Sequence, residues 1–554
     1  MERITTTIPQ AEVDRQLQYC REIARMNADR GEAPLAFVDT YGCQQNEADS
    51  ERIRGYLREM GYGFTQDEEQ AQIIVLNTCA IREHAEQRVL GNLGALVHVK
   101  RRNPEQIICL CGCMAQEAHV AEKVRQSFRH VDLVFGPHVL WKFPEYIHTL
   151  LTQRGRIFSN ADDPGSIAEG IPVVRQDKVK AWVSIMYGCN NFCSYCIVPY
   201  VRGRERSRRP EDILAEVRQL AEEGYHDITL LGQNVNSYGK DLEEPMDFAD
   251  LLEQVNAIPG DFLVRFMTSH PKDATHKLFE TMARCEKVAP VLHLPFQAGN
   301  DRVLKVMNRR HTRAQYLEKI RDLKSLIPDI VLTSDIIVGF PGETTEEFED
   351  TLKVLEEVRF DALFTFIYSP RVGTPAAKMD DPMPREEKLA NFNRLVALQD
   401  AISEEKHAAY IGKTVRCLLD GVSDDPRYDL TARTPGNRLV RVTGDREALG
   451  QFRDVKITGA NKWSLFGELA YPPSAAHRRR AAPSSRPRDR PARKTASPWM
   501  ACRVSCPLSS RWARSAPSGP RPRRRVRAAS TMRSLSAASF WLARSSPGIW
   551  YSQA

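Results

Sequence analysis

Apolar residues in this chain form short runs, and each run is followed by a longer amphipathic segment. Between residues 35 and 128 this pattern repeats three times, with a cysteine at the carboxyl end of each apolar run. Alternation of strands and helices in this way builds a parallel sheet covered by helices. The three predicted pairs are strand 35–43 with helix 46–60, strand 72–79 with helix 81–99, and strand 106–113 with helix 115–128.

The alternation continues after residue 177 with six further apolar runs. Six such units in series predict a partial, open TIM-like (β/α)6 barrel, whose chemistry lies at the carboxyl ends of its strands. We expect strands at 182–186, 228–231, 263–267, 291–294, 330–338 and 362–367, and helices at 210–223, 247–257, 274–285, 312–326 and 345–358.

After residue 407 the apolar runs become short and polar turns separate them. Runs at 415–419, 428–433, 439–442 and 452–457 predict a small β-barrel of the oligonucleotide-binding type. The chain is therefore predicted to be an α/β protein with an open parallel sheet, a partial barrel and a small β-barrel. The expected parts are an extension (1–33), the sheet domain (34–152), a linker (153–176), the partial barrel (177–406), the small barrel (407–472) and a tail (473–554).

The formal net charge of +7 comes from the tail. Of the 78 basic and 71 acidic residues, 18 basic and one acidic lie from residue 475 onward, which leaves 60 basic against 70 acidic in the rest. A tail of Arg, Ser, Pro and Ala cannot bury a core, so we predict disorder there and assign it no function. Because the remaining chain is acidic, any RNA contact must use local basic patches.

The sequence also bears on the compartment. Residues 1–10 lack the apolar centre of a signal peptide, and no run of 18 apolar residues predicts a membrane span. Thirteen cysteines in such a chain favour metal sites in a reducing compartment over a disulfide framework. We therefore expect a cytoplasmic protein without a membrane partner.

Three cysteines follow the first strand of the predicted barrel in a C-x3-C-x2-C pattern: Cys189, Cys193 and Cys196. Three thiolates so close in sequence can hold one face of a cubane iron–sulfur cluster and leave one iron open for another ligand. Zinc is the alternative, but a tetrahedral site would need a fourth Cys or His nearby, and the next histidine is His226. Plain buried thiols are the other alternative.

At these residues the chain resembles the radical S-adenosylmethionine (SAM) enzymes. The resemblance implies that SAM binds the open iron through its amino and carboxylate groups, and that an electron from the cluster cleaves it to a 5′-deoxyadenosyl radical. It further implies that Tyr195 packs near the SAM adenine and that Gln233 and Asn234, after the second strand, contact SAM. No histidine is assigned a catalytic role, and no catalytic residue is expected beyond the cluster ligands.

The three strand-end cysteines of the first domain are Cys43, Cys79 and Cys113. Because the carboxyl ends of parallel strands meet at one edge, we expect these residues to converge although they are distant in sequence. Buried structural cysteines are the alternative, and this is what we expect of Cys109 and Cys111.

The segments Y-G-C-Q-Q-N-E-A-D-S, L-N-T-C-A-I-R and G-C-M-A-Q resemble the amino-terminal domain of the radical SAM methylthiotransferases. This resemblance implies that Cys43, Cys79 and Cys113 hold a second [4Fe–4S] cluster, with one open iron. Cys111 is an alternative to Cys113 as the third cluster ligand. Cys113 is preferred because it occupies the cysteine position of the G-C-M-A-Q segment. The small β-barrel similarly resembles the TRAM domain, an RNA-binding module of these enzymes.

An arginine-rich segment, 201–210, follows the cysteine triplet. Such a run of charges ordinarily forms a solvated loop. Next to a SAM site, however, its guanidinium groups suit the oxygens of RNA phosphates, so we predict nucleic-acid contact there.

Within the family, L-G-Q-N-V-N-S-Y-G, R-F-M-T-S-H-P and F-I-Y-S-P-R-V-G-T-P-A-A-K-M look closest to the MiaB group. That group adds a methylthio group to C2 of N6-isopentenyladenosine at position 37 of tRNA, beside the anticodon. The resemblance implies two [4Fe–4S] clusters, SAM, a tRNA anticodon loop as partner and an electron donor such as flavodoxin or ferredoxin. We expect a monomer, and the sulfur source stays open.

Three alternatives remain at this point. Two are sister methylthiotransferases, which act on N6-threonylcarbamoyladenosine in tRNA or on an aspartate of a ribosomal protein. The third is a non-enzymatic iron–sulfur factor that binds RNA, which would not cleave SAM.

Overall fold

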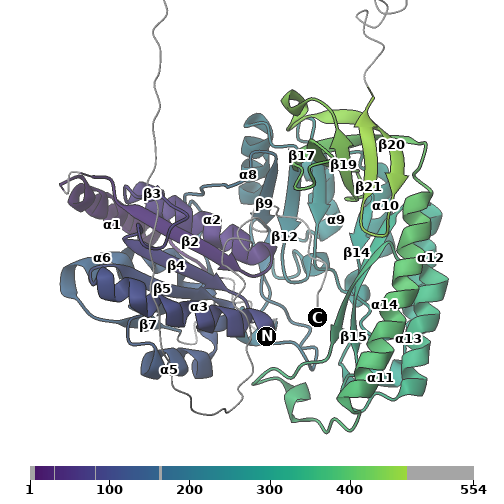
Figure 1. Ribbon diagram of the computed structural model, residues 1–554, viewed down its shortest axis with the longest axis horizontal. Helices are drawn as coiled ribbons and strands as arrows, with labels where there is room; N and C mark the ends of the chain where they lie inside the picture. The colour runs from purple at the N-terminus through teal and green to yellow at the C-terminus, as the bar shows by residue number, and fades with distance from the viewer. Residues whose placement is uncertain (1–5, 30–31, 81–82, 161–164, 471–554) are drawn as a thin grey trace, which may run out of the picture. The chain divides into compact units, whose positions relative to one another are not determined.

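The structure is a computed structural model that describes residues 6–29, 32–80, 83–160 and 165–470 (Figure 1). The predicted tail, residues 473–554, lies outside the described residues. None of the described helices is long and apolar enough to cross a membrane.

The first domain is built on a six-stranded parallel sheet with the order β3-β2-β4-β5-β6-β7. Alternate residues of the central strands enter two apolar cores, Ile73 and Val75 on one face and Ile74 and Leu76 on the other. Both faces are therefore covered by helices, as parallel sheets require. The strands are β2 (Leu35–Tyr41), β3 (Gly63–Phe64), β4 (Ile73–Thr78), β5 (Ile107–Gly112), β6 (Leu133–Phe135) and β7 (Ile157–Ser159).

Helices α1, α2 and α6 cover one face of this sheet, and α3 and α5 cover the other. The helices are α1 (Gln10–Ala28), α2 (Gln44–Glu59), α3 (Glu83–Arg102), α4 (Cys113–Gln116), α5 (Ala118–Ser127) and α6 (Phe143–Gln153). The helix predicted over 115–128 is thus divided into α4 and α5.

The structure differs from one expectation at the edge of this domain. Residues 157–159, predicted as linker, form β7 and pair with β6. So short a strand carries little periodicity, and only its tertiary partner reveals it. The segment predicted as an extension contains α1, whose Cys20 and Ile23 are buried in the core on one face of the sheet.

The second domain contains the six predicted parallel strands. Its sheets have the orders β9-β12-β13 and β14-β15-β16, and a parallel bridge between Val264 and Val288 joins them. The pairing of β9 with β16 is absent among the described strands, so the barrel is open as predicted. The strands are β9 (Lys180–Ser184), β12 (Asp227–Leu231), β13 (Leu263–Phe266), β14 (Val291–His293), β15 (Val331–Val338) and β16 (Ala362–Ile367).

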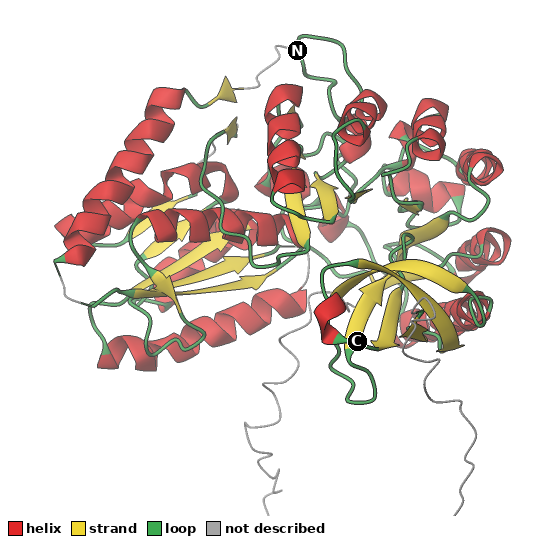
Figure 2. Cartoon of the chain, turned by 90° about the horizontal axis from the view of Figure 1, so that it is seen from above, coloured by secondary structure: helices red, strands yellow, loops and turns green. Residues whose placement is uncertain are grey.

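Helices surround the strands of this partial barrel on its outer side (Figure 2). The predicted ones are α8 (Pro210–Glu222), α9 (Phe248–Asn256), α10 (His276–Arg284), α12 (Arg313–Leu326) and α13 (Thr345–Val358). Two more were not predicted, α11 (Asp301–Val306) and α14 (Arg385–Ala408). The buried face of α14 mixes Phe392 and Leu395 with Gln399, which donates to the Phe360 carbonyl at 3.0 Å, so it shows no apolar stripe.

The third domain is a closed five-stranded β-barrel with the order β17-β18-β19-β21-β20, which confirms the predicted small barrel. Ion pairs fasten it to the partial barrel: Lys180 lies 2.6 Å from Asp420, and Arg438 pairs with Asp361. The strands are β17 (Thr414–Val422), β18 (Leu430–Arg433), β19 (Leu439–Thr443), β20 (Phe452–Ala460) and β21 (Leu465–Leu469). Cys417 lies in the apolar interior of this barrel.

Short elements complete the described chain. They are β1 (Thr6–Thr7) with β8 (Ser166–Ile167), β10 (Met186–Tyr187) with β11 (Arg206–Ser207), α7 (Val198–Val201), and the 3-10 turns η1 (Pro137–Lys142), η2 (Val235–Ser237), η3 (Pro271–Asp273), η4 (Pro375–Lys378) and η5 (Arg446–Ala448).

The loop after β15 contains a buried carboxyl group, Glu343, that makes stability depend on pH. Its Oε2 accepts hydrogen bonds from the backbone N–H groups of Gly339, at 2.7 Å, and Phe340, at 3.3 Å. Burial raises the pKa of Glu343 to about 7. Since the folded state then holds a proton that the unfolded state releases near pH 4.3, stability falls as pH rises from about 4.3 to about 7.

We expect Glu343→Gln to remove this fall, because the amide keeps an oxygen for both N–H groups and carries no charge. Relative to the parent, the free energy of unfolding of the variant should rise by about 3 kcal/mol between pH 4 and pH 8. Urea denaturation at both pH values measures this difference. Glu346→Gln, at an exposed position nearby, is the matched control, and a parent-like pH slope in Glu343→Gln would contradict the prediction.

Candidate active site

The cysteines at the ends of the first three long strands meet at one edge of the parallel sheet. Cys43 follows β2 and caps α2, Cys79 follows β4, and Cys113 begins α4 directly after β5. A hydrogen bond with the Cys79 thiol, helped by the positive charge of Arg202, lowers the pKa of Cys43 to about 6. Cys113 is close enough for its charge to act on Cys43, although burial raises the pKa of Cys113 itself.

The backbone around these cysteines is held by two buried asparagines. Asn46 Oδ1 accepts from the Cys43 backbone N–H at 3.3 Å, and Asn46 Nδ2 donates to the Thr78 carbonyl at 3.2 Å. Asn77 Nδ2 donates back to the Asn46 carbonyl at 2.8 Å. Gly112 has φ +93, and a Cβ there would lie 2.4 Å from Asn77 Oδ1, so only glycine lets the chain turn into α4. This scaffold fixes where the three sulfurs lie.

Cys109 and Cys111 are placed differently, in the interior of the first domain. Their side chains pack in the apolar core under β5, and burial raises the pKa of both thiols well above the usual value. Cys113, in contrast, accepts a hydrogen bond on Sγ from Arg202 Nε at 3.1 Å. The strand alternation therefore directs Cys111 away from the edge where Cys43 and Cys79 meet.

The second cysteine group lies in the loop between β10 and α7. Gly188 precedes it with φ +76, and a Cβ there would lie 2.0 Å from the Arg204 carbonyl oxygen. The Cys196 backbone N–H donates to the Cys193 carbonyl at 2.9 Å, so the loop folds back and gathers its thiols. Burial raises the pKa of Cys189 to about 12, and it also raises the pKa of Cys196, beside the two other cysteines.

Arg309 is a functional candidate that the sequence did not single out. This buried guanidinium places Nη1 3.5 Å from Cys193 Sγ and 3.5 Å from the Tyr195 hydroxyl, and Nη2 donates to the Pro295 carbonyl at 2.5 Å. A buried cation beside thiolates offsets their negative charge. No sequence motif marked it, because it comes from the chain after α11, more than a hundred residues beyond the cysteines.

The two cysteine groups approach each other across α7. Ala80, which follows Cys79, packs together with Cys113, Ile197 and Val201, and Ile197 follows Cys196 directly. Arg202, at the end of α7, bonds to both Cys113 Sγ and Asp49 Oδ2, the latter at 2.8 Å. One short helix thus connects the triplet loop to the edge of the first sheet.

Each cysteine group brings three thiols close to one another: Cys43 with Cys79 and Cys113, and Cys189 with Cys193 and Cys196. Thiolates are the ligands that [4Fe–4S] clusters take in proteins, so both groups have the donor chemistry that such a cluster needs.

The sequence matches three protein-family models and is similar to curated enzymes. The model of the radical SAM superfamily matches residues 183–355, that of Uncharacterized protein family UPF0004 matches 36–136, and that of the TRAM domain matches 408–470. A "tRNA-2-methylthio-N(6)-dimethylallyladenosine synthase" of Acetivibrio thermocellus is 48% identical over 462 residues, covering 83% of this chain and 96% of the relative. One from Clostridium perfringens is 50% identical over 438 residues, covering 78% and 97%.

The chain belongs to the radical SAM methylthiotransferases. Among solved structures, it is similar to the radical SAM methyltransferase TsrM from Kitasatospora setae, with 14% identity and a TM-score of 0.47 over 62% of this chain and 75% of that one.

The interior of the partial barrel contains buried polar groups that suit a polar ligand such as SAM. Several buried polar atoms at the carboxyl ends of its strands have no hydrogen-bond partner among the described residues. They are Asn234 Oδ1, Asn236 Nδ2 and Oδ1, Ser269 Oγ, His270 Nε2, Gln297 Oε1, Arg309 Nε and His311 Nε2. Buried polar groups are nearly always satisfied, so this set indicates a bound polar molecule or water.

The three residues predicted to contact SAM, Tyr195, Gln233 and Asn234, lie in loops that follow strands of the partial barrel. The Tyr195 ring packs edge-on against Phe340, with centroids 6.4 Å apart. Gln233 Oε1 accepts from the Gly188 backbone N–H at 2.5 Å, which ties β12 to the cysteine loop. Asn234 Nδ2 donates to Asp273 Oδ2 at 2.8 Å and leaves its oxygen available. His270 caps η3 by accepting from the Lys272 N–H.

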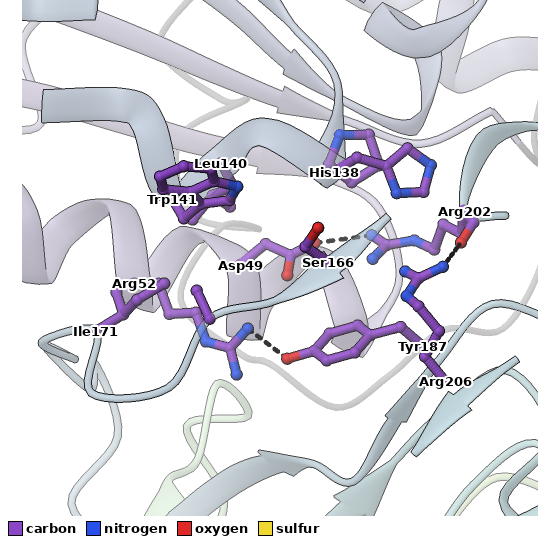
Figure 3. Close-up of a pocket in the computed structure, with 12 residues that line it drawn as sticks. Asp49, Arg52, His138, Leu140, Trp141, Ser166, Ile171, Tyr187, Arg202 and Arg206 are labelled. Carbon is purple, nitrogen blue, oxygen red and sulfur yellow. Dashed lines mark hydrogen bonds and ion pairs between the residues drawn. The ribbon is translucent and has the colours of Figure 1, made fainter. Parts of the chain in front are cut away.

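The prediction of a phosphate clamp at 201–210 is wrong for most of its arginines. Arg202, Arg206 and Arg208 are buried, and Arg208 pairs with Glu169 at 2.7 Å and with Glu216 at 2.8 Å. Arg209 is exposed but pairs with Asp212 at 2.8 Å, and exposed Arg204 stacks 4.4 Å from the Phe192 ring. Arg202 and Arg208 pair with carboxylates of distant segments, Asp49 (Figure 3) and Glu169, which the local sequence could not show.

Proposed function

We propose that this chain adds a methylthio group to C2 of N6-dimethylallyladenosine at position 37 of tRNA, next to the anticodon. The observation that carries this proposal is 48–50% identity, over most of both chains, to relatives named for that reaction. Two cysteine groups joined by α7 support it, because an aromatic C–H bond resists ordinary acid–base chemistry and such reactions rely on a cofactor.

Each group of residues has a separate task. Cys189, Cys193 and Cys196 hold one [4Fe–4S] cluster and Cys43, Cys79 and Cys113 hold the other. When bound, the clusters and SAM supply a 5′-deoxyadenosyl radical and a methylated sulfur. Tyr195 and Asn234 position SAM, Gln233 orients the cysteine loop through Gly188, and Arg309 balances the charge of Cys193.

The RNA partner has to present its base at the mouth of the barrel. Proteins read RNA bases most readily in single-stranded loops, where a base can be splayed out. The anticodon loop of tRNA is such a substrate, and we propose that the TRAM barrel, which the Lys180–Asp420 ion pair joins to the partial barrel, binds its backbone. We further propose a monomer that works in the cytoplasm and takes electrons from a flavodoxin or ferredoxin.

A reconstitution assay tests the proposal against its alternatives. The purified chain with iron, sulfide, SAM and dithionite is incubated with tRNA bearing either N6-dimethylallyladenosine or N6-threonylcarbamoyladenosine, and the nucleosides are analysed by mass spectrometry. We expect the methylthio product from the first tRNA only. Product from the second tRNA only, or no cleavage of SAM, would exclude the proposed reaction and favour a sister enzyme or a binding factor, respectively.

A further inference from the structure

The last strand of the partial barrel carries an exposed aromatic side chain on its inner face. Leu363 is buried in the core that joins the strands to the surrounding helices, and Ile367 packs against the same core. Because side chains alternate along a strand, Phe364 and Phe366 point to the other face, into the barrel. The ring of Phe364 agrees with this direction, since its centroid lies 5.7 Å from that of His293, a residue of β14. Phe366 therefore faces the interior at the open edge of the barrel, where β16 pairs with β15 alone among the described strands.

The exposure of this side chain is unusual for the molecule. Phe366 is 39% exposed, and it is the only phenylalanine of the described chain that exposes more than a third of its surface. Val372, in the loop that follows β16, is 63% exposed. Apolar surface left in water is unfavourable, and exposed apolar patches commonly mark a binding site. We therefore expect an apolar group of a ligand to cover these side chains.

Phe366 lies beside the place where SAM is expected. In the register of β15 and β16, Phe366 is opposite Ile337. Ile337 packs against the same apolar cluster as Tyr195, the residue predicted to lie near the SAM adenine. A group that covers Phe366 is therefore close to the site of the chemistry.

The loop that carries Val372 touches the cysteine loop. A Cβ on Gly373, the next residue, would lie 3.9 Å from Ile197 Cδ1, and Ile197 directly follows the cysteine triplet. The backbone N–H of Ala376 donates to the Ser194 carbonyl at 2.8 Å, which fixes the loop there. Both exposed apolar side chains thus lie toward the end of the barrel that places its chemistry.

A carboxylate lies on the same inner face. Asp335 belongs to β15, and its Oδ1 is 3.5 Å from His293 Nε2. It is close enough for its charge to act on Arg309, but Arg309 already contacts Cys193 Sγ at 3.5 Å and donates to a backbone carbonyl. A ligand group with its own carboxylate would meet the like charge of Asp335. The group that fits beside Phe366 is therefore apolar and uncharged.

We propose that Phe366 and Val372 contact the dimethylallyl group of the substrate adenosine, and that this contact selects it over a threonylcarbamoyl group. The inference rests on the proposed function, which brings this base to SAM. The dimethylallyl group is a branched hydrocarbon, so it can cover both side chains without losing a hydrogen bond. A threonylcarbamoyl group carries a hydroxyl and a carboxylate. Their hydrogen bonds with water would be lost against Phe366, and Asp335 would repel the carboxylate.

The test measures binding of RNA to the reconstituted holoenzyme by fluorescence anisotropy. Three anticodon stem-loops are compared, which differ only in the nucleoside at position 37: adenosine, N6-dimethylallyladenosine or N6-threonylcarbamoyladenosine. The variants are Phe366→Ser and Val372→Ser, with Phe366→Leu as the conservative change that keeps an apolar contact. Leu389→Ser is the matched control, because it removes a similarly exposed apolar side chain, 45% exposed, from α14 on the outer side of the barrel.

We expect the parent to bind the dimethylallyl stem-loop about tenfold more tightly than the unmodified one, as a hydrophobic contact of this size allows. Phe366→Ser should remove most of that preference and Val372→Ser a smaller part. Phe366→Leu should retain most of it, and Leu389→Ser all of it. Affinity for the unmodified stem-loop, and release of 5′-deoxyadenosine without RNA, should stay parental in every variant, since neither depends on the dimethylallyl group.

Parental preference in both serine variants would overturn the proposal, as would a parent that binds the dimethylallyl and unmodified stem-loops equally. Tighter binding of the threonylcarbamoyl stem-loop by the parent would also overturn it. If Phe366→Ser misfolds, its affinity for the unmodified stem-loop falls as well, and Val372→Ser then decides. A parent that shows the preference but makes no methylthio product would refute the proposed function alone. Product formation with an unchanged preference in the variants would refute this inference alone.

Discussion

Replacing Cys79 with alanine is expected to remove one of two iron–sulfur clusters and to leave the other active. The parent should contain about eight irons per chain after anaerobic reconstitution and the variant about four, because each cubane holds four. SAM cleavage should persist, since Cys189, Cys193 and Cys196 lie on the other side of α7 and share no ligand with the first group. Methylthio product should be absent.

The reciprocal variant separates the two groups further. Cys193→Ala should also contain about four irons, but it should lose SAM cleavage completely. Cys417→Ala, which removes a buried thiol inside the small β-barrel, is the control and should keep both clusters. Iron content, Mössbauer spectra and release of 5′-deoxyadenosine measure these outcomes. Retention of about eight irons in Cys79→Ala would show that the first group does not hold a cluster.

The second large effect is expected at Arg309. Its guanidinium lies 3.5 Å from Cys193 Sγ, and a buried positive charge so near favours the reduced, more negative form of a cluster. We expect Arg309→Met to lower the reduction potential of that cluster and to slow SAM cleavage by about tenfold or more, as removal of a buried charged donor from an active site usually does. A redox titration followed by electron paramagnetic resonance measures the potential.

Two further variants distinguish this charge effect from a loss of packing. Arg309→Lys keeps the charge but not the planar fork that reaches the Pro295 carbonyl, so it should recover part of the potential. Arg310→Met makes the same change at the exposed neighbouring residue and should behave like the parent. If Arg309→Met had the parental potential and rate, Arg309 would be a packing residue only.

Local pattern was sufficient for most of the architecture. The strand and helix periods of β2, β4 and β5 and of the six barrel strands are short-range properties, and parallel strands necessarily place their carboxyl ends at one edge. Cys43, Cys79 and Cys113 could therefore be grouped although dozens of residues separate them. The choice among the three methylthiotransferase branches, in contrast, came from sequence resemblance alone. Hydrophobic periodicity and charge do not distinguish them.

Elements whose stability comes from distant partners could not be recognised locally. The buried face of α14 is largely polar and satisfied by hydrogen bonds such as Gln399 to the Phe360 carbonyl. The strand β7 is only three residues long and depends on β6. Neither element has a hydrophobic periodicity that is regular and long enough to be recognised in the sequence.

The positions of charged side chains and of cysteines also differ in how far the local sequence predicts them. The sequence by itself determined that two cysteine groups exist and that arginines follow the second one. Only the tertiary structure decided that Arg202 and Arg208 are buried against Asp49 and Glu216, and that Arg309 reaches Cys193. The reason is physical: a cysteine's place at a strand end follows from its neighbours in sequence, whereas the partner of a long charged side chain depends on which distant carboxylate or thiol the fold brings within reach.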